Sequence, residues 1–531
     1  MKYVILAAGN GRRFAEEGVK TPKPLVEVMG KPMIGRLIDI LTACGAESIN
    51  IVSNRRMGEL TAYLHKRKAE GAPLEIRPIE SENSYRSLAE ASRGIDGKFV
   101  ALTVDTIFST DEFREFVRRF EEMPEGETLM GLTGYVDDES PLYAKIEGDA
   151  ITDYRYGGEP FAGDVRVSAG IYGLTAESVA TGGEAQSLSD WQRQLAREGR
   201  VKVKPHVLGK ALDIDNSHDR IEAEIYLRTL EYKSTLKSMD TEEHIDLMFY
   251  RPIGYAWALL FRRLGVSPNA VTIASIFIGI AAGICFYFPD IRVNAAGILL
   301  LVWANTYDSC DGQLARLTGR YSPLGRILDG IAGDLWFLTI YIAICLRTVH
   351  TVGFFEQHNW AIWLIGAAAG ASHIMQAAVA DRYRQLHLFF LKGAKGSELD
   401  TSTEVARRYL SLTWKQHFFA KLIQYLYYRY TVYQEKLTPR MKAFRLKLRE
   451  RYENEGIPKR LSDEFLGESV KLCKWENFMT FNWRTIFLFT CILTGYPWVY
   501  FGIELTVFNA VLVYTIARHE AICREMTRRE G

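Results

Sequence analysis

The chain has 531 residues, a formal net charge of +1 and a hydrophobic share of 48%. This length predicts two or three domains. The seven cysteines include no CxxC pair, which argues against a disulfide framework or a zinc site. The first six residues run straight into a glycine-rich loop without a long apolar segment, so we do not expect a signal peptide.

The overall averages suggest a soluble protein, but they are misleading. Apolar residues are concentrated after Ala270, whereas the earlier part of the chain has an ordinary composition. The sequence therefore predicts a soluble domain joined to a membrane domain.

A short apolar strand, residues 2–6, opens into a glycine-rich loop with basic residues. The loop contains Gly9, Gly11 and Arg13, and Lys23 follows it. Such a loop presents backbone N–H groups and cations to phosphates. The chain has no G-x4-G-K-[ST] loop and no G-x-G-x-x-G pattern, which argues against P-loop and dinucleotide-binding domains.

This stretch resembles the nucleotidyltransferase motif L-A-A-G-x-G-x-R followed by P-K-P-L, and the likeness extends over roughly residues 1–230. Later segments agree with it in order: 83–88, 99–105, 168–172 and 213–219. The resemblance implies a Rossmann-like α/β fold. It also implies nucleotide-binding roles for Ala8, Gly9, Gly11 and, at the nucleobase, Ser87.

In the implied reaction, a substrate phosphate attacks the α-phosphorus of a nucleoside triphosphate and pyrophosphate leaves. Catalysis of this kind depends on positioning and charge neutralisation. Arg13 and Lys23 would stabilise the triphosphate, and Asp105 with Asp213 or Asp215 would hold Mg²⁺. The alternative for Lys23 is a solvated surface lysine.

Two positions depart from the family pattern. Val104 precedes Asp105 where a glycine is usual, and Tyr156 stands roughly where many relatives have a lysine for the acceptor phosphate. Lys145 or Arg155 could substitute for that lysine. An inactive, regulatory first domain is therefore the alternative hypothesis.

Apolar segments in the second half predict six membrane helices of the length that crosses a bilayer. They cover residues 270–288, 293–310, 327–348, 360–380, 485–500 and 501–517. Ahead of them, residues 241–264 alternate apolar and basic side chains, which is typical of an interfacial amphipathic helix, with a plain structural helix as the alternative. Residues 349–359 and 488–517 contain no Lys or Arg, so the positive-inside tendency places both termini and the soluble domain in the cytoplasm.

Four carboxylates stand at the ends of two of these apolar runs, where an unpaired charge is costly: Asp308, Asp311, Asp329 and Asp334. They could hold divalent cations, form a proton path or pair with bases. Asp308 and Asp311 are three residues apart and share a helix face, which favours cations. Oxygen ligands suit Mg²⁺ or Mn²⁺. Gly312 allows close approach of a ligand, and Arg316 could grip its phosphate.

The pattern D-x2-D-G-x2-A-R-x8-G-x3-D resembles the signature of the CDP-alcohol phosphatidyltransferase family. The resemblance implies that Asp308, Asp311 and Asp329 hold metal and that Asp334 is the general base and a fourth ligand. It implies nucleotide-binding roles for Gly312, Ala315, Arg316 and Gly325. Capped helix ends with a structural ion network are the alternative.

The fourth carboxylate departs from this family pattern. It is expected four residues after Asp329, where this chain has Gly333, and it comes one residue later at Asp334. One residue is about 100° on a helix. Either a π-bulge returns Asp334 to the metal face, or the helix begins later than in the family.

Residues 385–480 form an insertion that the compact membrane family does not need. Its aromatic and basic helical pattern suits the headgroup layer or packing on the soluble domain. Nucleic-acid binding is the alternative, but no RNA-binding signature accompanies it.

The expected organisation is therefore a nucleotidyltransferase domain, an interfacial linker, membrane helices 1–4, a cytoplasmic helical insertion, and membrane helices 5–6 with a basic tail. The corresponding ranges are 1–230, 231–268, 269–384, 385–480 and 481–531. The fusion resembles the bifunctional inositol-1-phosphate cytidylyltransferase and di-myo-inositol phosphate phosphate synthase family. That family makes a CDP-alcohol from CTP and an alcohol phosphate and then uses it, and the resemblance also implies a homodimer.

The sequence does not choose between a soluble inositol phosphate and a lipid alcohol as the acceptor of the second step. Phosphocholine or phosphoethanolamine is an alternative head group. A transporter with a nucleotide-sensing domain is a further alternative, based on the six spans and on the polar residues Ser372, His373 and Gln376.

Overall fold

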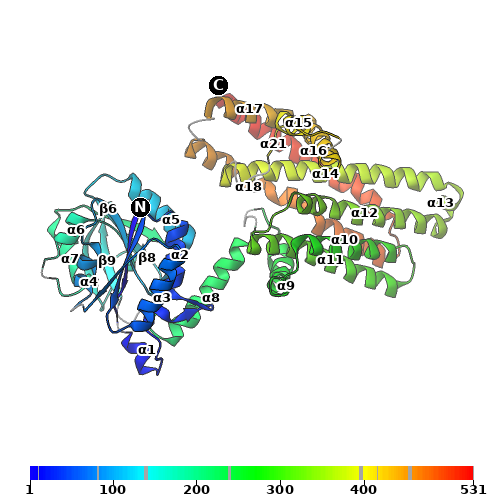
Figure 1. Ribbon diagram of the computed structural model, residues 1–531. Coiled ribbons are helices and arrows are strands. Elements are labelled where there is room, and N and C mark those ends of the chain that lie inside the picture. The colour runs from blue at the N-terminus through cyan, green and yellow to red at the C-terminus, as the bar shows by residue number, and fades with distance from the viewer. Residues whose placement is uncertain are drawn as a thin grey trace. The chain divides into compact units, whose positions relative to one another are not determined.

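The chain forms two compact units, Met1–Leu230 and Glu231–Gly531. The structure is a computed structural model, and it describes residues 1–9, 11–80, 83–136, 141–183, 185–236, 241–393, 399–414, 417–452 and 457–529. Asn10 of the glycine-rich loop and parts of the expected linker and insertion lie outside these residues. Figure 1 shows a mixed unit of strands and helices and a unit built of helices.

Unit 1 is built on a nine-stranded sheet. Its path runs β10-β9-β11-β6-β1-β4-β5, and β8 joins β11 to β12. The strands are β1 (Lys2–Ala7), β4 (Ser48–Asn54), β5 (Leu74–Ile79), β6 (Lys98–Thr103), β8 (Thr128–Thr133), β9 (Leu142–Glu147), β10 (Ala150–Tyr156), β11 (Val167–Thr175) and β12 (Val203–Leu208). Strand β1 is parallel to β4 and β6, whereas β11 runs antiparallel to β6.

Helices cover both faces of this sheet, as the apolar runs of the central strands require. The helices that begin in unit 1 are α1 (Arg12–Glu16), α2 (Met33–Ala43), α3 (Gly58–Ala69), α4 (Ser84–Ser92), α5 (Thr110–Glu122), α6 (Ala176–Ala180), α7 (Leu188–Glu198) and α8 (Ser217–Ser234). One apolar core lies under α2, α3 and α5, and a second lies under α4 and α7. The expected Rossmann-like α/β domain is confirmed.

Short elements shape one edge of the sheet. A 3-10 helix, η1 (Lys23–Leu25), follows α1, and β2 (Glu27–Val28) pairs with β3 (Lys31–Pro32). Strand β7 (Thr106–Phe108) pairs with β13 (Ala211–Asp213). Because β1 and β6 are parallel, the loops after them emerge together at this edge, beside β13.

Unit 2 is entirely helical in its described part. A π-helical turn, η2 (Asp246–Tyr250), leads into α9 (Arg251–Leu264). The later elements are α10 (Pro268–Cys285), α11 (Ile291–Thr318), α12 (Pro323–Thr351), α13 (Gly353–Gln357), α14 (Asn359–Lys392), α15 (Ser402–Ser411), α16 (Phe418–Leu437), α17 (Pro439–Tyr452), α18 (Lys459–Phe478), α19 (Phe481–Leu493), α20 (Val499–Ile503), the π-helix η4 (Glu504–Phe508) and α21 (Asn509–Arg529).

Among the described residues, four helices are long and apolar enough to cross a membrane: Pro268–Cys285, Leu324–Thr351, Asn359–Lys392 and Val499–Arg529. The expected span at 293–310 falls on α11, which is long but carries the charged Asp308–Arg316 segment. The span expected at 485–500 is wrong in extent, because α19 ends at Leu493 and Gly495 turns the chain with a φ of +83°. With 13 residues, α19 is about 20 Å long and shorter than a bilayer core.

Helix α14 does not end where the insertion was expected to begin, at residue 385. It continues to Lys392, and its second half packs with α17, α18 and α21 around a separate apolar core. That core includes Tyr383, Phe444 and Phe465. The insertion helices therefore form one body with the ends of two long apolar helices.

The polar residues that suggested a transporter hydrogen-bond between helices. His373 meets the Tyr341 hydroxyl at 3.1 Å, and Asn509 donates to the Ser372 hydroxyl over 3.0 Å. Gln376 accepts a hydrogen bond of 2.7 Å from Arg484, whose guanidinium also pairs with Glu504. These contacts satisfy the buried polar groups, as is common in membrane bundles.

The pH dependence of folding stability can test this packing at Glu243. Glu243 is buried and accepts hydrogen bonds from the Thr480 hydroxyl and, over 3.0 Å, from the Asn482 amide. Burial, with a contribution from Asp246, raises the pKa of Glu243 to about 7. A raised carboxyl pKa means that stability is fully present below the unfolded pKa of about 4.3 and is lost as the pH rises to about 7.

We therefore expect Glu243→Gln to stabilise the protein at pH 8, by on the order of 2 kcal/mol, and to have little effect at pH 5. Thermal unfolding of the detergent-purified protein at the two pH values measures this difference. An equal shift of the midpoint at both values would contradict the assignment.

Candidate active sites

The first site lies at the edge of unit 1 where β1, β6 and β13 end. The Lys23 ammonium lies 2.5 Å from a carboxylate oxygen of Asp105 and 2.5 Å from one of Asp215. Burial acts to lower the pKa of Lys23, but the two carboxylates outweigh it and raise that pKa. Lys23 is thus a buried cation that neutralises two acids, and the solvated-lysine alternative is wrong.

A pocket of about 300 Å³ opens over these groups. Arg13 lines it and pairs with Asp215 at 2.6 Å. Asp105, Asp213 and Asp215 line it as well, together with Gly170 and Tyr172 of the expected substrate-side segment. The structure therefore brings together the predicted cations and carboxylates of this domain in one concave site.

Asp213 lines this pocket and is exposed there. The Thr106 hydroxyl donates a 2.9 Å hydrogen bond to its carboxylate, and Thr103 contacts the Thr106 hydroxyl at 2.7 Å. Desolvation by the surrounding protein and the neighbouring Asp105 raise the pKa of Asp213 to about 7. Near neutral pH this carboxyl therefore carries a proton part of the time, which a bound cation would displace.

Two glycines make this arrangement possible. Gly11 has a φ of +61°, and a Cβ there would lie 2.7 Å from the Lys23 Cβ. Gly170 has a φ of +67° and leaves no room for a Cβ against the Thr103 and Thr106 hydroxyls. Both positions need a left-handed backbone and close contact, which only glycine supplies without strain.

Other predicted residues of this domain lie elsewhere. Among the described residues, Ala8, Gly9, Gly11 and Ser87 are absent from the pocket lining; Ser87 is buried in α4 and donates to the Asn83 carbonyl over 3.3 Å. Ser84, one turn earlier, lines the pocket instead. Tyr156 also lines it.

The two suggested substitutes for an acceptor-phosphate lysine are engaged outside the pocket lining of the described residues. Lys145 pairs with Glu147 at 2.6 Å, and Arg155 stacks on Phe161 with 4.3 Å from its guanidinium carbon to the ring centre.

The donor set of this site fits a divalent cation, because it consists of carboxylate oxygens around a buried positive charge. The Lys23 ammonium stands between Asp105 and Asp215, where positive charge is required. Asp105, Asp213 and Asp215 would hold the ion, and the ion would neutralise charge on the phosphates.

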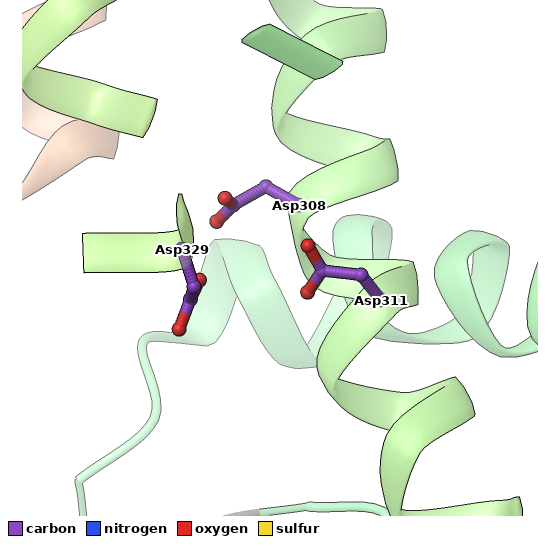
Figure 2. Close-up of side chains that lie close together, drawn as sticks. All are labelled: Asp308, Asp311 and Asp329. Atoms are coloured by element: carbon purple, nitrogen blue, oxygen red, sulfur yellow. The ribbon is translucent and has the colours of Figure 1, made fainter. Parts of the chain in front are cut away.

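The second site lies where α11 and α12 face each other. Ligand oxygens of Asp308, Asp311 and Asp329 all lie within 4.8 Å of one another. Figure 2 shows the three side chains converging, two from α11 and one from α12. The shared helix face expected for Asp308 and Asp311 is what allows both to meet Asp329. Three carboxylate oxygens at this spacing fit a hard divalent cation.

Neighbouring residues fix this group. The buried Thr272 hydroxyl of α10 donates a 2.5 Å hydrogen bond to Asp311. Gly312 and Ala315 continue the helix face that carries the two α11 carboxylates, since they lie within about 60° of Asp308. These small residues leave space beside the carboxylates for a ligand.

Arg316 and Gly325 border the same space. The Arg316 guanidinium lies over Gly312, with 3.2 Å between Nη2 and a Cβ placed on that glycine. One guanidinium nitrogen, Nη2, is buried without a hydrogen-bond partner among the described residues. Gly325 lies against Asn269, and its N–H donates a 2.9 Å hydrogen bond to the Ser322 hydroxyl. The Nε of the Arg316 guanidinium donates a 2.5 Å hydrogen bond to the Thr235 carbonyl, which holds the group in place. A guanidinium with one free nitrogen beside three carboxylates suits a phosphate ligand.

Asp334 does not join this group. Helix α12 runs from Pro323 to Thr351 as a regular α-helix, so the expected π-bulge is wrong. Five residues turn the helix by about 500°, which places Asp334 about 140° from Asp329. It lies near α16 instead: burial raises the pKa of Tyr430, and Asp381 and Asp334 raise it further.

We therefore expect Asp334→Asn to lower the activity of this domain by less than about tenfold, because a general base typically contributes 10²–10⁴-fold. Rates of CMP formation with saturating Mg²⁺ measure the effect, with Asp329→Asn as the matched control. A loss at Asp334 as large as that at Asp329 would show that Asp334 reaches the substrate.

Two family models match the chain, one in each half. Residues 3–133 match the family of the MobA-like NTP transferase domain, and residues 265–395 match the CDP-alcohol phosphatidyltransferase family. The chain joins a nucleotidyltransferase domain to a CDP-alcohol phosphatidyltransferase domain. Both are transferase domains, so the protein is an enzyme, and the four long apolar helices of unit 2 make it a membrane protein.

Several curated relatives carry the name bifunctional IPC transferase and DIPP synthase. The protein of Rubrobacter xylanophilus is 26% identical over 62% of this chain and 74% of its own length. That of Archaeoglobus fulgidus is 28% identical over 67% of this chain and 68% of its own length. The solved inositol-1-phosphate CTP transferase from T. maritima aligns with a TM-score of 0.38 and 16% identity, over 43% of this chain and 96% of that one.

Sequence reasoning missed several supporting residues. Thr103 and Thr106 orient Asp213 in the nucleotidyltransferase domain, and Asp219 accepts from the Asp215 N–H over 2.8 Å. In the second domain Arg251 donates to the Ser309 hydroxyl over 3.2 Å. A hydroxyl one or two positions from the motif carboxylate Asp105 was the available signal for the threonines. Arg251 lies too far in sequence from the second motif to give a signal of this kind.

Proposed function

We propose that the protein makes a CDP-alcohol from CTP and an alcohol phosphate, and then transfers the phospho-alcohol to an acceptor hydroxyl with release of CMP. The observation that carries this proposal is the presence in one chain of two carboxylate sites, each suited to a divalent cation and a phosphate. Inositol phosphate is the alcohol phosphate favoured by the family resemblance and by the names of the curated relatives.

In the first step, an oxygen of the alcohol phosphate attacks the α-phosphorus of CTP, and pyrophosphate leaves. Arg13 and Lys23 bind the negative charge of the triphosphate, and Asp105 with Asp213 and Asp215 holds Mg²⁺. Their contribution is positioning and charge neutralisation in a site shaped before the substrate arrives.

In the second step, the acceptor hydroxyl attacks the β-phosphorus of the CDP-alcohol, a new P–O bond forms, and the bond to CMP breaks. Asp329, the most exposed of the three carboxylates, takes the hydroxyl proton. Arg316 binds the phosphate beside Gly312. The bound ion supplies neutralisation of the diphosphate charge.

The topology proposed with this function places both termini and the nucleotidyltransferase domain in the cytoplasm. The support is the distribution of Lys and Arg, which are absent from 349–359 and 488–517. CTP would then reach the first site, and the CDP-alcohol the second, from the same compartment. The homodimer and a lipid acceptor remain predictions from the family resemblance.

Mass spectrometry of the products tests the function. Purified protein receives CTP and Mg²⁺ with inositol phosphate, choline phosphate or ethanolamine phosphate, each with and without lipid. We expect CDP-inositol, pyrophosphate and, with an acceptor, CMP. A choline or ethanolamine product would establish the alternative head group, and absence of any CDP-alcohol or CMP would refute the proposal.

A further inference from the structure

Helix α16 carries an exposed apolar and basic face that the two transferase sites do not use. Its exposed apolar side chains are Phe418 (53% exposed), Leu422 (36%), Tyr425 (37%), Leu426 (58%) and Tyr433 (39%). They fall within a sector of about 100°, and Arg429 and Lys436 lie in the same sector. Leu410 and Trp414, 73% and 44% exposed, extend the surface toward α15. We call these residues the α16 face.

The opposite side of α16 packs on α14. Thr431, Gln434, Glu435 and Thr438 are buried there, and the Gln434 amide donates a 2.8 Å hydrogen bond to the Ala378 carbonyl. Figure 1 shows α16 alongside α14 within unit 2. The exposed sector of α16 is therefore fixed in direction by a firm contact on its other side.

The position of this contact along α14 shows where α16 lies relative to the lipid-facing part of that helix. From Asn359 to Ile374, α14 keeps an exposed face that includes Trp360, Leu364 and Ile374. Beyond Ile374 the helix is half-buried or buried until Phe390. Ala378 lies 19 residues after Asn359, or about 29 Å along the helix, which is close to the thickness of a bilayer core.

Helix α16 thus packs on α14 where the lipid-facing surface of α14 ends. Asp334 of α12 lies near Tyr430 at the same level, one and a half turns beyond the metal-binding Asp329. A helix at the edge of the hydrocarbon layer with exposed Phe, Leu and Tyr side chains has the composition of an interfacial helix.

Charge points to the same partner. The single acidic side chain of α16 is Glu435, which is buried and pairs with Lys442 at 2.6 Å. The exposed charges of the α16 face, Arg429 and Lys436, are both positive. Anionic lipid headgroups attract such residues by about 1 kcal/mol each.

We propose that the α16 face rests on the bilayer surface nearest the three metal-binding carboxylates and prefers anionic lipid there. The apolar side chains enter the boundary between headgroups and acyl chains, and Arg429 and Lys436 lie among the headgroups. The insertion is in this way a membrane-surface element that packs on the end of the lipid-facing part of α14.

Nitroxide labels on the full-length protein in vesicles test this proposal. One label is placed by Leu426→Cys and a matched control by Ala420→Cys, an exposed position about 120° around the same helix. The native cysteines that are not buried, Cys44 and Cys285, are replaced in both variants. Accessibility to lipid-soluble oxygen and to a water-soluble nickel chelate is then compared in vesicles with phosphatidylglycerol or with phosphatidylcholine only.

We expect the ratio of oxygen to nickel accessibility to be several-fold higher at position 426 than at position 420. Arg429→Gln with Lys436→Gln should remove any difference between the two lipid compositions at position 426. Equal nickel accessibility at both positions would refute membrane contact. Shielding of position 426 from both reagents, with dipolar broadening between labels, would instead show that a second copy of the chain covers this face.

Discussion

Replacing Asp329 by Asn should reduce CMP formation from a supplied CDP-alcohol by at least about 10²–10³-fold, a typical loss when one group that stabilises developing charge is removed. Asp329 is the single contribution of α12 to the three-carboxylate group, whose ligand oxygens lie within 4.8 Å. Without it, Asp308 and Asp311 bind an ion from one side only, and the proton acceptor proposed for the acceptor hydroxyl is lost.

The same variant should release pyrophosphate from CTP and alcohol phosphate at the wild-type rate, because that site belongs to a separate compact unit. Both rates are measured on one detergent-purified preparation, so the first reaction serves as the folding control for the second. Mn²⁺ binding followed by electron paramagnetic resonance should show a loss of metal at the membrane site. Retention of CMP formation would remove Asp329 from the site.

Replacing Lys23 by Met should give the reverse pattern, with pyrophosphate release lowered by at least about 10²–10³-fold and CMP formation from supplied CDP-alcohol unchanged. Lys23 is the buried cation of the first site and holds Asp105 and Asp215, each at 2.5 Å. Its loss leaves two carboxylates in the pocket without their main partner and removes a cation from the triphosphate.

Thermal unfolding accompanies this measurement, since unpaired buried charges also destabilise a fold. Lys23→Arg is the matched variant that keeps the charge but changes its shape. We expect it to restore stability more than activity, because the guanidinium cannot occupy the same compact position beneath Gly11. Unchanged pyrophosphate release in Lys23→Met would exclude Lys23 from the reaction.

The nucleotidyltransferase site was predictable because its residues follow short apolar strands. A parallel pair such as β1 and β6 brings the ends of both strands to one edge, so Arg13 and Asp105 could be placed together from sequence. The Lys23 contacts were not predictable in the same way. They depend on η1 folding back under the loop, which a left-handed Gly11 permits.

The second site was predictable up to its third carboxylate. Asp308 and Asp311 share a face at a spacing of three, and the short connection to α12 brings Asp329 opposite them. The orientation of Asp334 depends on whether one extra residue is absorbed as a bulge, and sequence alone does not decide that. In the structure α12 stays regular, so Asp334 points about 140° away from Asp329.

The number of membrane spans was the weakest prediction of the fold. Composition identifies apolar runs but not the turns inside them, and the run at 485–500 is interrupted by Gly495 and Pro497. The insertion was recognised as helical and basic, but its packing on α14 and α21 depends on an apolar core that forms only between distant segments.

The position of Lys23 also has a consequence for the order in which ligands bind. An ammonium between Asp105 and Asp215 competes with any other cation for the same oxygens, so free Mg²⁺ meets an occupied position. A triphosphate gives Lys23 a new anionic partner and brings further negative charge to the pocket. Metal and nucleotide should therefore bind with positive cooperativity, each raising the affinity of the other by the same factor.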